Sequence, residues 1–132
     1  MHSDTIHRWL HTQNTMITVL LIDDEPAVCR ALSRLLRFLG FQVLTAHSGA
    51  EAIQIADDTQ LTSQGSLKID IVLSDVQMTG MSGHDVAAAF ADRCPVILMS
   101  GALEQQLNGV LAKPFTPTEL LRHINRALHL AA

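Results

Sequence analysis

The chain has 132 residues, of which 48% are hydrophobic and 17% charged, and its formal net charge at pH 7 is −4. This length fits one domain, and the composition is too apolar for a disordered chain. The acidic excess and the lack of a basic stripe argue against direct nucleic-acid binding, and no apolar run reaches the roughly 18 residues of a membrane span. Cys29 and Cys94 lack CxxC spacing and no secretory signal opens the chain, which indicates a cytoplasmic protein with reduced thiols.

Residues 1–15 show little hydrophobic periodicity, and we expect them to form an N-terminal extension, either a flexible tail or a short docking helix. Three of the seven histidines lie there, so a metal-binding histidine cluster is the less favoured alternative. Residues 16–132 are expected to form the folded domain.

Strand and helix patterns alternate through that domain. Residues 17–22 form an apolar, β-branched run that is typical of a strand buried on both faces of a parallel sheet. Later strands are predicted at residues 42–46, 69–74, 96–99 and 110–112. Amphipathic spacing predicts helices over residues 26–39, around 53–56, around 86–90 and over 117–128.

Capping signals precede three of these helices. The acidic run at residues 23–25 offers cap candidates before Pro26, and Ser48 and Thr116 each stand three residues before a glutamate, as in a capping box. In the first helix, three arginines lie on the face opposite the apolar positions, namely Arg30, Arg34 and Arg37. Residues 57–68 read as a polar loop.

Alternating strands and helices predict an α/β fold in which right-handed crossovers join parallel strands, giving an open five-stranded parallel sheet with helices on both faces. Five polar residues fall where strands end: Asp23, Asp24, Asp75, Ser100 and Lys113. The carboxyl ends of parallel strands share one sheet edge, where ligands of such folds bind. We therefore expect these side chains to converge.

Such a set has a coherent chemistry. Crowded carboxylates repel one another unless a cation neutralises them, and hard oxygen ligands suit Mg²⁺. A carboxylate is also a nucleophile that forms an aspartyl phosphate. Phosphoryl transfer then needs positioning and charge neutralisation, which a metal ion and a lysine provide.

Four runs carry a resemblance to a known family: VLLIDDEP at residues 19–26, SDVQM at 74–78, PVILMSG at 95–101 and KPF at 113–115. In this order they resemble the receiver domain of two-component response regulators over roughly residues 16–130. The run at 95–101 is similar to receivers attached to hybrid sensor kinases. The resemblance implies a flavodoxin-like strand order, 2-1-3-4-5.

By that resemblance, Asp75 is the phosphoacceptor and takes a phosphoryl group from a phosphohistidine. Asp24 and Asp75 would coordinate Mg²⁺ together with the main-chain carbonyl of Gln77, while Asp23 would act chiefly through bound water. Lys113 would contact the phosphoryl group.

The same resemblance makes Ser100 the switch hydroxyl and implies a cis peptide between Lys113 and Pro114. It implies a signalling domain, not an enzyme, that catalyses only its own phosphorylation and dephosphorylation. The phosphodonor would be a sensor histidine kinase or a histidine phosphotransfer domain, and the downstream protein is not identified. Neither nucleic-acid contact nor membrane insertion is implied.

The sequence departs from the family pattern at three places. Thr79 stands where the family usually has proline, and Ser82 where it often has aspartate or asparagine. Only nine residues, 101–109, separate the last two strands, which predicts that the family's fourth helix is shortened or missing, or that the fifth strand is displaced. Val110 stands where most receivers place an aromatic ring, which predicts a changed readout of phosphorylation.

Other readings fit less well. A receiver-like module that binds partners without phosphorylation is the main alternative, motivated by the short connection at residues 101–109. An aspartate-nucleophile phosphatase of the haloacid dehalogenase type has a second aspartate where Gln77 stands here. A dinucleotide-binding domain needs a GxGxxG run after the first strand, which is missing.

Overall fold

The computed structural model describes residues 16–61, 68–101 and 110–131. Strands and helices alternate along them, as predicted: β1 (Thr18–Ile22), α2 (Pro26–Phe38), β2 (Gln42–Ala46), α3 (Gly49–Leu61), β3 (Ile71–Asp75), α4 (Gly83–Phe90), β4 (Val96–Ser100), β5 (Val110–Ala112) and α5 (Pro117–Ala131). None of the helices in these ranges combines the length and apolarity needed to cross a bilayer. The predicted extension at residues 1–15 lies outside the described residues.

The sheet has five parallel strands in the order β2-β1-β3-β4-β5, which confirms the predicted fold. β5 pairs with β4 through Leu98 and Val110, so the fifth strand occupies the sheet edge and is not displaced. Of the connection between these two strands, only Gly101 is described, and no helix follows β4 before residue 102. The predicted loss of a helix at residues 101–109 therefore falls almost wholly outside the described residues.

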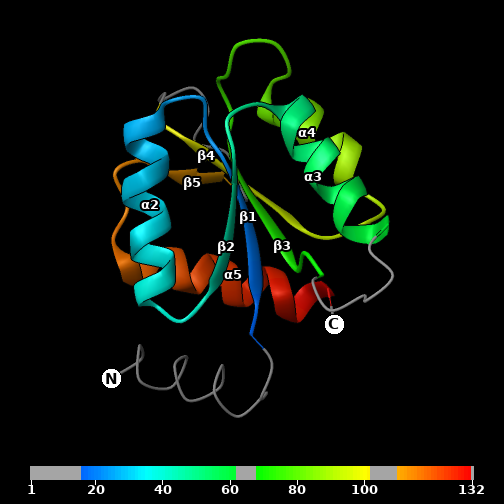
Figure 1. Ribbon diagram of the computed structural model, residues 1–132. Coiled ribbons are helices and arrows are strands. Elements are labelled where there is room, and N and C mark those ends of the chain that lie inside the picture. Colours follow the sequence, from blue (N-terminus) through cyan, green and yellow to red (C-terminus); the bar gives the residue numbers. More distant parts are fainter. Residues whose placement is uncertain (1–15, 62–67, 102–109, 132) are drawn as a thin grey trace.

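Two helices cover each face of the sheet (Figure 1). Alternate residues of β1 explain its continuous apolar run, since Val19 and Leu21 pack under α2 and α5. Leu20 and Ile22 pack under α3 and α4 on the opposite face. All five residues of β1 are buried. This interior strand, flanked by β2 and β3, therefore places the residues that follow it at the carboxyl edge of the sheet.

The helix starts match the predictions in part. Thr116 and Glu119 form the reciprocal capping box of α5, with N–H···O distances of 3.0 and 3.1 Å. At α2 the acidic N-cap position and Pro26 as the first helical residue are as predicted, but the N-cap residue Glu25 makes no side-chain cap hydrogen bond. Asp23 instead accepts the Glu25 N–H.

Two helix boundaries differ from the predictions. α3 continues to Leu61 through residues predicted as a polar loop, and a hydrogen bond of 2.9 Å from Gln54 to Asp58, one turn apart, supports that extension. α4 begins at Gly83, because Ser82 and Asp85 form a capping box that the sequence analysis missed.

Candidate functional site

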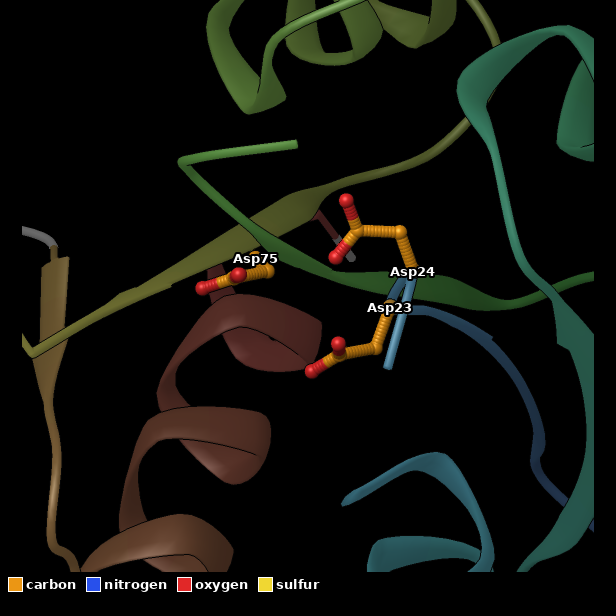
Figure 2. A group of neighbouring side chains, drawn as sticks. All are labelled: Asp23, Asp24 and Asp75. Carbon is orange, nitrogen blue, oxygen red and sulfur yellow. The ribbon is translucent and has the colours of Figure 1, made fainter. Parts of the chain in front are cut away.

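Three carboxylates meet at the carboxyl edge of the sheet. Asp23 and Asp24 directly follow β1, and Asp75 ends β3. These strands are neighbours, with Ile22 paired to Ser74, so their ends lie side by side. The three residues offer oxygen atoms that all lie within 4.8 Å of one another, and Figure 2 shows their side chains gathered at this edge. The structure thus brings together the three acidic residues that the strand ends predicted.

Asp23 is the most buried of the three, with 1% of its surface exposed. Its Oδ1 accepts a hydrogen bond of 2.9 Å from the Glu25 N–H. Its Oδ2 is buried and has no hydrogen-bond partner among the described residues. A buried carboxylate oxygen without a partner is costly, and a bound cation removes that cost.

Lys113 is the cation that faces this cluster. It follows β5, and its Nζ lies 3.2 Å from Asp75 Oδ1 and 3.7 Å from Asp23 Oδ2. The first distance permits a hydrogen bond, and the second is too long for one. Among the described residues, one lysine opposite three carboxylates leaves an excess of two negative charges. The peptide bond from Lys113 to Pro114 is cis, as the family resemblance implied.

The pKa of the Asp75 carboxyl is raised above its ordinary value. Burial is the largest cause, the charges of Asp23 and Asp24 add to it, and Lys113 opposes it. The folded-state pKa therefore exceeds the unfolded-state pKa. Ionised Asp75 costs stability at neutral pH, and this cost disappears as the pH falls below the ordinary carboxyl range. Folding holds Asp75 in a place that favours charge neutralisation.

The Asp24 side chain is held by Thr79, which stands where the family usually has proline. Its Oδ2 accepts from the Thr79 N–H at 3.1 Å and from the Thr79 hydroxyl at 3.5 Å. A proline at this position has no N–H to donate. Thr79 is therefore a positioning residue that the sequence analysis noted without assigning it this role.

Glycines permit the tight backbone path after Asp75. Gly80 has φ of 83°, in the left-handed region that favours glycine. A Cβ on Gly83 would lie 2.5 Å from the Asp75 carbonyl oxygen. The first residue of α4 can therefore pack against the Asp75 backbone only because residue 83 has no side chain.

The structure places Gln77 in this same loop, with an exposed side chain. Gln77, Asp24 and Thr79 line one surface depression of about 550 Å³. Gln77 is therefore on the Asp24 side of the cluster, where its main-chain carbonyl was expected to serve as a ligand.

Ser100 is the last residue of β4 and is 2% exposed. The Lys113 N–H donates a hydrogen bond of 2.9 Å to the Ser100 carbonyl oxygen. β4 lies between β3 and β5, so Ser100 reaches the same sheet edge as the acidic cluster. All residues expected at the site thus come from one edge.

The comparisons with known proteins agree with this geometry. A family model of the response regulator receiver domain matches residues 19–125. The chain is 32% identical over 124 residues to the transcriptional regulatory protein CpxR of Escherichia coli, covering 86% of this chain and 50% of CpxR. This chain belongs to the response regulator receiver domain family. It spans about half the length of the curated relatives it matches.

Two solved structures are similar over most of the chain. The response regulator TrrA of Thermotoga maritima, in complex with Mg²⁺ and BeF, has a TM-score of 0.69 and 25% identity, covering 86% of this chain and 100% of that one. The receiver domain of the hybrid histidine kinase CckA has a TM-score of 0.66 and 33% identity, covering 84% and 98%. The similarity to the CckA receiver agrees with the resemblance of residues 95–101 to receivers attached to hybrid sensor kinases.

Removing one carboxylate tests the electrostatics of the cluster. We expect Asp23→Asn to raise the free energy of unfolding without Mg²⁺ by about 1 kcal/mol, because it removes one of three repelling charges. Mg²⁺ at about ten times its dissociation constant should stabilise the wild type by about 1.4 kcal/mol and the variant by less. Urea unfolding in EDTA and in Mg²⁺ measures both effects.

The matched control for that experiment is Asp92→Asn, which neutralises an exposed carboxylate elsewhere. It should behave as the wild type in both solutions. An Asp23→Asn protein that is no more stable in EDTA and gains as much from Mg²⁺ as the wild type would contradict this account.

Proposed function

We propose that residues 16–132 form a phosphoacceptor receiver domain that takes a phosphoryl group from a phosphohistidine onto Asp75. The observation that carries this proposal is the Asp75 carboxylate itself, which lies 3.2 Å from Lys113 and within 4.8 Å of two further carboxylates. A structural role for Asp75 does not account for this crowding of like charges. Receiver domains pair with sensor histidine kinases, so such a kinase or a histidine phosphotransfer domain is the proposed donor.

The donor set fits Mg²⁺. Its members are carboxylate oxygens, which hard cations prefer, and one of them is the buried Asp23 oxygen without a partner. Asp23, Asp24 and Asp75 would hold the ion, with the Gln77 carbonyl as a further ligand. When bound, the ion supplies positive charge that neutralises the carboxylates and the transferred phosphoryl group.

Asp75 is the nucleophile in the proposed transfer. One of its carboxylate oxygens forms a bond to phosphorus while the bond from phosphorus to the histidine nitrogen breaks. The bonding electrons stay with the imidazole, which leaves as a neutral ring because its other nitrogen carries a proton in the phosphohistidine donor. The Lys113 ammonium, 28% exposed and already at Asp75, stabilises negative charge on the phosphoryl oxygens.

Ser100 and Lys113 are proposed to report the phosphoryl group. A backbone hydrogen bond joins the two residues, so a displacement of either one would move the ends of both β4 and β5. Val110, in the register position beside Leu98, has no ring that could rotate between two positions when the Ser100 hydroxyl moves. We therefore propose that the conformational change caused by phosphorylation involves α5 only slightly.

Replacement of the nucleophile tests the proposed transfer. Asp75→Asn should abolish phosphoryl uptake from acetyl phosphate and Mg²⁺, because the amide cannot form an acyl phosphate. Intact-protein mass spectrometry measures the added group. Asp92→Asn removes an exposed carboxylate and should retain full uptake. A wild-type protein that gains no mass and forms no tight beryllofluoride complex would favour a module that works without phosphorylation.

Amide hydrogen exchange tests the proposed readout. With Mg²⁺ and beryllofluoride, we expect increased protection in the segments that follow β1, β3 and β4, because these contact the site directly. α5 should change less, since Val110 cannot make the aromatic switch. The Asp75→Asn variant is the control, and adding Mg²⁺ and beryllofluoride should not change its protection in these segments or in α5. Strong protection changes confined to α5 would contradict this proposal.

A further inference from the structure

A row of arginines on α2 has no role in the proposed phosphoryl transfer. Arg30, Arg34 and Arg37 are exposed and recur at intervals of four and three residues, so they share one face of the helix. The row spans about 10 Å at the helical rise per residue. It borders a groove of about 400 Å³ between α2 and the end of β2, whose other lining residues are Pro26, Cys29, Ser33, Thr45 and His47. We call this feature the arginine groove.

No acidic side chain lines the arginine groove, although the charges of Asp23 and Glu51 reach Cys29 in its wall. Within the described parts of the chain, the ion pairs use Lys113 and Arg93 and none of these three arginines. The guanidinium group of Arg37, the last arginine of the row, donates a hydrogen bond of 3.5 Å to the Val43 carbonyl oxygen. Three guanidinium groups thus stand together on a chain whose net charge is −4.

His47 fixes the end of the groove nearest the acidic cluster. Its Nδ1 donates to the Asp23 carbonyl oxygen at 3.3 Å. Among the described strands, β2 is at the sheet edge and pairs with β1 alone. The arginine groove therefore lies beside this edge strand, and its lining residue His47 contacts the backbone of Asp23 in the acidic cluster.

We propose that the arginine groove docks an acidic helical segment of a protein partner. Guanidinium groups bind carboxylates in pairs of parallel hydrogen bonds, and acidic side chains one helical turn apart match the spacing of the row. A nucleic-acid backbone fits less well, because its charge continues past the row into the acidic cluster at Asp23 and Asp24. This docking depends on α2 and β2 alone and holds whether or not Asp75 accepts a phosphoryl group.

A synthetic peptide tests the docking. The probe is an alanine-rich helical peptide with glutamates at positions i, i+4 and i+7, titrated into the intact protein and followed by fluorescence anisotropy. We expect binding that weakens with added salt. Arg30→Glu with Arg34→Glu should weaken it at least tenfold, because two attractions become repulsions.

The matched control is Arg122→Glu with Arg126→Glu, which makes the same change in net charge on the exposed face of α5. This control should bind the peptide as the wild type does. Thermal melting checks that both double variants fold, and Arg30→Gln with Arg34→Gln replaces the first if it does not.

Three results would overturn the proposal. The first is a wild-type protein that does not bind the peptide at low salt. The second is an equal loss in both double variants, which would mean that any surface arginines serve the peptide equally well and that the arginine groove is not a specific site. The third is tighter binding of a DNA duplex than of the peptide, which would assign the groove to nucleic acid.

Discussion

Electrostatic repulsion between Asp23, Asp24 and Asp75 is the constraint on which the functional part of this structure depends. Each of the three carboxylates offers one oxygen within 4.8 Å of the others, and Lys113 is the cation beside them among the described residues. One of these oxygens is buried without a hydrogen-bond partner. This arrangement is destabilising unless a cation binds there, because bringing like charges together away from water costs free energy.

The rest of the fold holds the repelling groups in place. The adjacency of β1 and β3 brings the strand ends together, and the full burial of β1 leaves its end little freedom. Gly83 allows α4 to begin directly against the Asp75 backbone. Thr79 donates to Asp24 from the opposite loop. Strain from like charges is thus resisted by backbone packing and by hydrogen bonds that ionised groups strengthen.

The sequence predicts much of this structure because apolar periodicity and strand order are local properties. The run at residues 17–22 and the polar residues at strand ends predict both the sheet and the gathering of Asp23, Asp24 and Asp75. The contacts of Thr79 and His47 could not be predicted in this way. Each contact joins residues far apart in the chain through a main-chain or side-chain geometry that appears only after folding. For the same reason Asp23 could be mistaken for a helix cap, although it is buried at the site.

A crystal structure of the protein with Mg²⁺ and beryllofluoride tests the account most directly. It should show the metal about 2.0–2.1 Å from carboxylate oxygens of Asp24 and Asp75. The beryllofluoride should sit on Asp75 with the Lys113 ammonium against it, and Asp23 should face the metal. A metal ion bound away from these carboxylates, or an Asp75 that carries no beryllofluoride at saturating concentration, would contradict the central claim.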